Sequence, residues 1–195
     1  MVDGPGPAHH SLWENKHIRL RGFKADDWPY FSRFEKDSND ARSVFRIVPP
    51  RADEAHEAET AELVRKPVDE DCFSLAIESR DSGEIAGAIS VIDADRRAGR
   101  FTCGLAVDRD HRRRGYATEA VLTLLRYMFD ERRFHKCEVY IYAFNTASLA
   151  LHEKIGFTQE GRLREREFFE GHHWDVVVMG ITSDEYRERR SPVSL

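Results

Sequence analysis

The residues best suited to chemistry lie in one short stretch, residues 107–120, which reads VDRDHRRRGYATEA. An apolar run ends at Val107, and Gly115 precedes a helical pattern of apolar residues. Between them lie three consecutive arginines, Arg112, Arg113 and Arg114. The first N–H groups of a helix have no partner within the helix, and they carry the positive end of the helix dipole. Together with the guanidinium groups, these N–H groups predict a binding site for a pyrophosphate, which we call the seat.

The expected contacts extend into the helix itself. Gly115 and Ala117 have no bulky side chain, so a phosphate can approach the backbone there, and Thr118 adds a hydroxyl group. The seat is therefore expected to comprise Arg112, Arg113, Arg114, Gly115, Tyr116, Ala117 and Thr118. The alternative is a solvated charge cluster that caps a helix. The spacing fits neither the P-loop, which needs Gly-Lys-Ser/Thr, nor the dinucleotide fingerprint, which needs three spaced glycines.

A second polar group follows the next predicted strand. It consists of Asn145, Ser148 and His152, and it precedes the pair Gly156-Phe157. Ser148 and His152 are four residues apart, so a helix places them on one face, where both can reach the same reacting atom. A histidine in such a helix is more often a packing residue than a catalyst, and this alternative stays open for His152.

These segments resemble the GNAT family of acetyl-coenzyme A-dependent N-acetyltransferases. Arg112-x-x-Gly115-x-Ala117 fits the R/Q-x-x-G-x-G/A signature of that family. Residues 145–157 resemble its N-x-x-S/A…GF segment, and residues 156–179 are similar to the G-F-x-x-E-G…R…G-x-x-x-D tail of the RimJ/RimL type, which acetylates ribosomal-protein N-termini. The matches follow one another in order from about residue 18 to residue 186.

The resemblance implies an α/β (α+β) fold, a V-splayed mixed β-sheet of about seven strands flanked by helices. Acetyl-CoA is the implied co-substrate, with no metal. Its pantetheine arm would pair with the backbone near Leu105, Ala106 and Val107, and Asn145 and Ser148 would face the arm. An extended chain of amides can add to a sheet edge as a surrogate strand, which supports this layout.

The implied reaction is direct attack of an amine on the acetyl thioester. It needs an N–H group for the oxyanion, for which Val107 is the candidate, and a proton donor for the departing thiolate. Many relatives use a tyrosine as the donor; this chain has His152 at that place, and Ser148 is the other candidate. Relatives often have a glutamate on the strand before the oxyanion site, where this chain has Thr102.

The acceptor is expected to be an amine-bearing peptide or small molecule. A peptide α-amine, with a pKa near 8, is partly neutral at pH 7, whereas a lysine, with a pKa of about 10.4, is not. Because Thr102 cannot remove a proton, a protein or peptide N-terminal α-amine is favoured. The alternatives are a small-molecule amine, such as a polyamine or an antibiotic, and a non-catalytic coenzyme A-binding sensor. A monomer or a homodimer is expected.

Composition excludes several other classes of protein. With 195 residues, 41% hydrophobic and 33% charged, the chain suits one folded domain. We expect that domain at residues 15–188, between flexible tails at 1–14 and 189–195. A net charge of −5 argues against a nucleic-acid partner bound by phosphate neutralisation. No apolar run approaches the roughly 20 residues of a membrane span, so a cytoplasmic protein without a membrane partner is expected.

The elements that must position these residues alternate along the chain. The pattern predicts strands at 18–23, 73–78, 84–92, 101–107 and 136–143, and a hairpin of strands 159–169 and 174–181. It predicts helices at 25–37, 51–66, 115–130 and 146–155. A strand–helix–strand unit requires a crossover, so one parallel join is expected, around Val107. The cysteines, Cys72, Cys103 and Cys137, are expected to be small buried side chains.

Overall fold

The structure, a computed structural model, describes residues 11–38, 41–42, 47–67 and 69–190. Seven strands form one mixed sheet in the order β1-β2-β3-β4-β5-β7-β6. The strands are β1 (Ile18–Arg21), β2 (Ser74–Ser79), β3 (Ile85–Asp95), β4 (Arg100–Val107), β5 (Lys136–Tyr142), β6 (Thr158–Phe169) and β7 (His172–Thr182). The α-helices are α1 (Trp28–Lys36), α3 (Asp53–Arg65), α4 (Tyr116–Arg126), α5 (Thr146–Ile155) and α6 (Ser183–Arg190). There are also three short helical turns, η1 (Ala25–Asp27), η2 (Arg109–His111) and η3 (Tyr127–Glu131).

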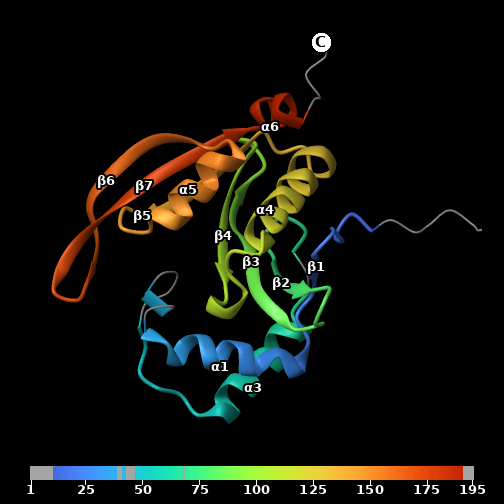
Figure 1. The fold of residues 1–195 in the computed structure, drawn as a ribbon, viewed down its shortest axis with the longest axis vertical. Helices are drawn as coiled ribbons and strands as arrows, with labels where there is room; N and C mark the ends of the chain where they lie inside the picture. Colours follow the sequence, from blue (N-terminus) through green and yellow to red (C-terminus); the bar gives the residue numbers. More distant parts are fainter. Residues whose placement is uncertain (1–10, 39–40, 43–46, 68, 191–195) are drawn as a thin grey trace, which may run out of the picture.

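The parallel join between β4 and β5 is short. It runs from the pair Arg100 and Lys136 to the pair Thr102 and Glu138. Beyond it, residues 103–107 of β4 and 139–142 of β5 are not paired with each other, and we call these two segments the splay. Figure 1 shows β5, β6 and β7 leaving β4 as a separate arm. The V-splayed mixed sheet is therefore confirmed.

The position of the join differs from the expected one. The sequence placed it around Val107, at the end of β4, but the strands pair only at the start of β4. The reason is that β5 pairs with β7 along its whole length and follows the direction of that strand instead. The end of β4 thus keeps one side free of any paired strand in the sheet.

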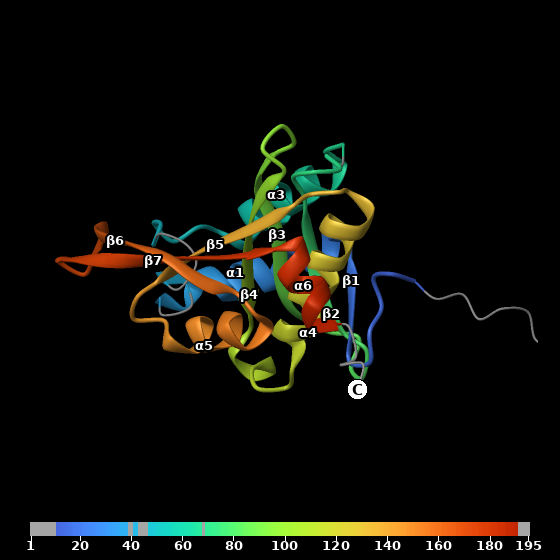
Figure 2. The same ribbon diagram turned by 90° about the horizontal axis from the view of Figure 1, so that it is seen from above.

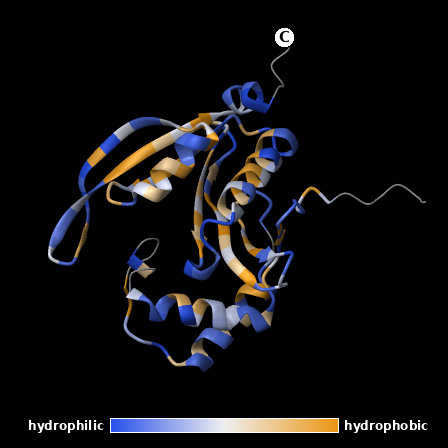
Figure 3. Ribbon diagram, in the orientation of Figure 1, coloured by the Kyte–Doolittle hydropathy of each residue, from blue (hydrophilic) through white to orange (hydrophobic). Residues whose placement is uncertain are grey.

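The core lies between the sheet and its helices. Apolar side chains of α4, including Val121, Leu124 and Leu125, pack with Ile89 of β3 and Phe101 of β4. Figures 1 and 2 show α4 and α5 on the same side of the sheet, one beside each arm of the V. Figure 3 shows hydrophobic residues concentrated on β3, β4 and the inner side of α4, whereas α6 is hydrophilic.

Several boundaries differ from the sequence expectation. The helix expected to reach residue 130 ends as an α-helix at Arg126 and continues as the π-type turn η3. Helix α6 extends to Arg190, two residues into the stretch assigned to the C-terminal tail. At the other end, Leu20 donates a backbone hydrogen bond to the carbonyl of Trp13 at 2.8 Å, so ordered contacts begin before residue 15. Residues 1–10 lie outside the described part.

Two further observations concern the chain as a whole. Cys103 and Cys137 are buried as expected, but Cys72 is exposed because it ends the turn that leads into β2. Across the described ranges, no helix has both the length and the apolar character required to cross a membrane.

Candidate active site

The turn before α4 has an unusual backbone. Gly115, the N-cap residue, has a φ of 83° and makes no side-chain cap. Arg113 also lies in the left-handed region, at a φ of 62°. Glycine adopts this conformation without the steric cost of a Cβ atom, so Gly115 is needed for the turn as well as for open space above it. Nothing lies within 4 Å of the place where its Cβ would be.

The start of α4 leaves its N–H groups open. The first backbone bond of the helix runs from the Glu119 N–H to the Gly115 carbonyl at 3.1 Å. The N–H groups of Tyr116, Ala117 and Thr118 have no acceptor among the residues that the structure describes. The Tyr116 side chain is buried and its hydroxyl lies 3.0 Å from Ser79 Oγ, so only its backbone faces the turn. This is the arrangement that binds anions at helix N-termini.

The three arginines surround this turn at the surface. Arg112, Arg113 and Arg114 are all exposed. Arg112 Nε donates a hydrogen bond to the Val107 carbonyl at 3.1 Å, which connects the arginine to the end of β4. An ion pair between Arg33 of α1 and Asp108 also connects the start of this loop to helix α1. The three exposed guanidinium groups therefore directly precede the open N–H groups in the chain and can add positive charge near them.

The end of β4 directs two peptide N–H groups away from β3. Asp108 donates its N–H to the Ala86 carbonyl in β3 at 2.9 Å. In an antiparallel pair, hydrogen-bonded and non-hydrogen-bonded residues alternate, so Ala106 also pairs toward β3, while Val107 and Leu105 point away from it. Of the three predicted residues, Leu105 and Val107 thus offer backbone groups to the splay, and Ala106 does not.

The start of α5 is capped. The Asn145 side-chain oxygen accepts a hydrogen bond from the Ser148 N–H at 3.1 Å, so Asn145 holds the first turn of the helix. Ser148 Oγ lies 3.4 Å from His152 Nδ1, which brings the two predicted side chains together. The predicted residues Asn145, Ser148 and His152 thus form one connected group.

His152 is more enclosed than a surface histidine. It is 4% exposed, and its ring packs edge-on against Phe157. Burial lowers the pKa of His152, and its hydrogen bond to Ser148 opposes that shift only in part. Because the Ser148 carbonyl, 2.8 Å away, can only accept, Nδ1 carries the proton of the neutral ring. Nε2 is then unprotonated, and a neutral His152 has no proton there to give.

Other charged residues of the sheet have partners that the fold provides. Glu78 is buried and forms ion pairs with Arg19 and Arg21 in the β1–β2 region. Asp175 pairs with Arg162 across the β6–β7 hairpin at 2.7 Å. Thr102 lies beside Glu138 in the last parallel pair of β4 and β5. Sequence reasoning missed Glu138, because only the strand register places this carboxylate beside Thr102.

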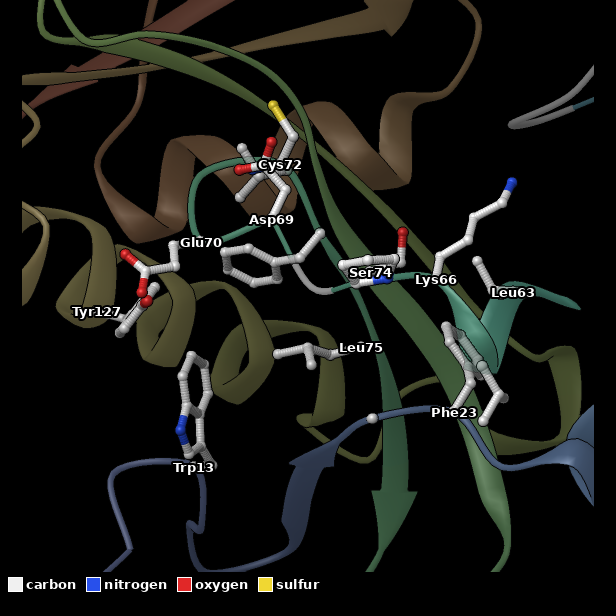
Figure 4. A pocket seen from close by; sticks show the side chains of 15 residues that line it. Trp13, Phe23, Leu63, Lys66, Asp69, Glu70, Cys72, Ser74, Leu75 and Tyr127 are labelled. Atoms are coloured by element: carbon white, nitrogen blue, oxygen red, sulfur yellow. The ribbon is translucent and has the colours of Figure 1, made fainter.

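Among the predicted site residues, only Arg114 borders either of two larger cavities. A pocket of about 440 Å³ lies near the start of β2, with Trp13, Leu75 and Tyr127 in its wall (Figure 4). None of the predicted site residues lines it. A second, of about 430 Å³, borders the turn before α4 and includes Asp108 and Arg114. Within the described ranges, no group of three or more His, Cys, Asp or Glu residues is arranged for a metal ion.

Known proteins share the family and the fold of this chain. Residues 17–158 match the family described as "Acetyltransferase (GNAT) domain". The SPβ prophage-derived uncharacterized N-acetyltransferase YokL of Bacillus subtilis is 33% identical over 177 residues, which cover 90% of this chain and 96% of that protein. A putative ribosomal N-acetyltransferase of Bacillus subtilis, YdaF, is 27% identical over 104 residues, 53% of this chain and 57% of that one. The spermidine N-acetyltransferase of Vibrio cholerae, solved with CoA and spermine, has a TM-score of 0.76 at 20% identity, covering 89% of this chain and 99% of that one.

Proposed function

The chain belongs to the GNAT acetyltransferase family, and from this premise we propose that it transfers an acetyl group from acetyl-CoA to the α-amine of a protein or peptide N-terminus. Family membership makes the chain an acyltransferase. The roles of individual residues and the identity of the acceptor are our proposals. The observation that carries the coenzyme contacts is the open N terminus of α4, which follows the unpaired end of β4 after residues 108–115 and the turn η2.

The proposed coenzyme contacts follow from the open groups. The N–H groups of Tyr116, Ala117 and Thr118 bind pyrophosphate oxygens, and the exposed arginines beside them add positive charge. The pantetheine amides pair with the free backbone groups of Leu105, as an added strand does at a sheet edge. At Val107 the carbonyl already accepts a hydrogen bond from Arg112, so the N–H is the group that faces the thioester end of the arm. Acetyl-CoA fits the residues present, because the phosphates meet donors and the arm meets unpaired backbone.

The proposed chemistry uses a backbone group and a hydroxyl group. The Val107 N–H stabilises the negative oxygen that develops as the amine adds to the thioester carbonyl. The Ser148 hydroxyl donates a proton to the departing thiolate. His152 is the weaker candidate for this step because its buried ring is neutral and Nδ1 is bound to the Ser148 carbonyl. Its proposed role is to hold Ser148.

An α-amine acceptor follows from its acidity. About one α-amine in ten is already neutral at pH 7, whereas a lysine amine, with a pKa of about 10.4, is almost wholly charged. The resemblance to the RimJ/RimL type and to YdaF, a putative ribosomal N-acetyltransferase, supports this acceptor class. A cytoplasmic location would suit such an acceptor.

A polyamine is the second candidate acceptor. The support for it is the match along nearly the whole chain to the spermidine N-acetyltransferase of Vibrio cholerae. A match at 20% identity shows a shared fold only. The acceptor pocket depends on loops that vary between relatives, so the match does not identify the acceptor.

One assay separates these candidates. Release of free thiol from acetyl-CoA is followed with three acceptors: peptides with free N-termini, the same peptides blocked at the N-terminus with a lysine present, and spermidine. We expect the free N-termini to have the highest kcat/KM. Faster acetylation of the blocked peptides or of spermidine would contradict the α-amine proposal. Absence of thiol release with all three, in a protein that binds coenzyme A, would indicate the non-catalytic sensor instead.

A further inference from the structure

Four aromatic side chains gather at the free end of the arm formed by β5, β6 and β7, and we call them the aromatic cluster. Tyr142 ends β5, Phe144 follows it, Phe169 ends β6, and Trp174 lies near the start of β7. The centroid of the Phe144 ring is 4.9 Å from that of Trp174 and 5.2 Å from that of Tyr142. The Trp174 ring stacks on Phe169 at 5.3 Å, and its N–H donates to the Phe169 carbonyl at 3.2 Å. The four rings therefore form one connected apolar surface.

Phe144 is the exposed member of this cluster, and its backbone is held in place. Its side chain is 40% exposed although three rings contact it. The Asn145 N–H donates to the Tyr142 carbonyl at 2.8 Å, and the Thr146 N–H donates to the Phe144 carbonyl at 2.9 Å. These bonds fix the turn between β5 and α5. The open part of the Phe144 ring is therefore a preorganised apolar surface, which binds a ligand at a lower entropic cost than a mobile side chain.

The strand register places Phe144 level with the proposed oxyanion site. Val107 and Ala143 each lie five residues beyond the last parallel pair of β4 and β5. Because strands rise by a similar distance per residue, the two arms of the V reach the same level at these two residues. Phe144 directly follows Ala143, and Ser148 lies in the first turn of α5. The Val107 N–H is therefore at the level of the turn that carries both Phe144 and Ser148, across the splay.

The aromatic cluster lies on the face of the sheet opposite α5. Ile141 of β5 belongs to the core, against which Leu149 of α5 packs, so Tyr142 points to the other face. Tyr142 pairs with Val176 of β7, and Trp174 is two residues from Val176, so Trp174 shares that face. Helix α4, which begins at the proposed seat, lies on the same side of the sheet as α5 (Figures 1 and 2). Coenzyme A bound at the seat therefore occupies one face, and the face with the aromatic cluster remains for the amine.

The charged residues next to the aromatic cluster already have partners. Asp175 pairs with Arg162 at 2.7 Å, and Glu170 pairs with Arg42 at 3.0 Å. A cationic tail, such as that of a polyamine, would have to compete with these arginines and would lose water on binding. An apolar side chain would instead bury its surface against the open ring of Phe144. The cluster therefore suits an acceptor with an apolar group next to its amine.

We propose that the aromatic cluster binds the side chain of the acceptor's first residue and thereby selects N-termini that begin with a large apolar or aromatic residue. This inference rests on the proposed function and names the class of N-terminus. In an N-terminal residue, the side chain and the α-amine are attached to the same carbon atom. An amine that attacks at the level of the Val107 N–H therefore carries its side chain to the level of Phe144. Phe144 is the specificity-determining residue in this account.

The test uses two peptides with free α-amines that differ only in the first residue, which is phenylalanine or serine. In the parent, kcat/KM for the phenylalanine peptide should exceed that for the serine peptide by about 10-fold or more, the discrimination typical of an apolar pocket. Phe144→Ala should reduce this ratio to about threefold or less, with unchanged affinity for coenzyme A. The matched control is Phe168→Ala. Phe168 is 64% exposed on the same hairpin but on the face opposite Phe169 and Trp174, so this variant should keep the parental ratio.

The ratio between the two peptides separates selection from stability, because a variant that is only less stable loses rate with both peptides equally. Phe144→Leu, which keeps an apolar side chain without the ring, is a milder second variant and should give an intermediate ratio. An active parent without preference for phenylalanine, an unchanged ratio in Phe144→Ala, or the same fall in Phe168→Ala would overturn this inference while leaving the proposed function intact. A parent without transfer to any N-terminus would overturn the proposed function, and this inference with it.

Discussion

Helices α4 and α5 begin beside the two arms of the splayed sheet, but their N termini differ. At α4 the N-cap is a glycine without a side chain, and three N–H groups stay open. At α5 the N-cap is Asn145, whose side chain accepts the Ser148 N–H. An open terminus offers backbone donors to an anion, whereas a capped terminus has used one of its donors and fixes its first turn. The difference assigns the phosphates to α4 and a positioned side chain, Ser148, to α5.

The largest expected effect lies at the capped terminus. Ser148→Ala removes the proposed proton donor, so kcat should fall by about 100-fold or more, the usual cost of losing a general acid. The affinity for coenzyme A should change much less. His152→Gln is the matched variant on the same helix face and should keep kcat within about threefold, far less than the loss of a general acid. A slow His152→Gln and a normal Ser148→Ala would reverse the two roles.

The next effect compares one substitution at both termini. Ala117 and Ala147 each occupy the second position of their helix. A glutamate there stabilises a helix through its dipole, so both variants should fold. At α4 the new carboxylate repels the pyrophosphate, and we expect Ala117→Glu to weaken acetyl-CoA binding by about 100-fold, which is about 2.7 kcal/mol. Ala147→Glu should change it by less than about threefold, or 0.7 kcal/mol. Calorimetry measures both, and similar losses in the two variants would contradict the assignment.

A smaller effect concerns the cap itself. Asn145→Ala removes the acceptor for the Ser148 N–H and should lower the free energy of unfolding by about 1 kcal/mol. Asn145→Asp keeps an acceptor and should preserve most of the stability. Urea unfolding gives both values. A neutral Asn145→Ala would mean that the cap contributes little and that Asn145 is present for the coenzyme.

The smallest effect is the pH dependence of stability that comes from His152. Burial lowers its pKa in the folded protein, so the unfolded chain binds the proton more readily. The contribution of His152 to the free energy of unfolding is therefore complete above about pH 6.5 and falls as the pH drops through that value toward the folded pKa. Urea unfolding at neutral and mildly acidic pH should show this slope in the parent and a weaker one in His152→Gln. Equal slopes would contradict the role of burial.

Much of the fold was predictable because its signals are local. Helix α5 begins and ends as predicted, since Asn145 caps one end and Gly156 follows the other. The β6–β7 hairpin turns at Glu170 and Gly171 as expected, and both have positive φ. Helix α6 escaped notice because its sequence is mostly charged and its apolar contribution to the core is the single ring of Tyr186.

Residues of the candidate site were predictable only where they belong to a contiguous sequence motif. The arginines and Gly115 stand in one contiguous signature, and Ser148 and His152 in another. Glu138 has no such signature, because its position beside Thr102 arises from a strand register, which depends on residues far apart in the chain. The same holds for the Arg33–Asp108 ion pair, whose partners are far apart in the chain.

The most direct test of the account observes the backbone N–H groups themselves. In ¹⁵N-labelled protein titrated with coenzyme A, the amide signals of Tyr116, Ala117 and Thr118 report the proposed pyrophosphate seat. The amides of Thr146 and Ala147, in the first turn of α5, serve as the internal comparison. We predict the larger shifts at the three α4 amides, as expected for new hydrogen bonds to phosphate oxygens. Binding of coenzyme A with larger shifts at Thr146 and Ala147, and little change at α4, would contradict it.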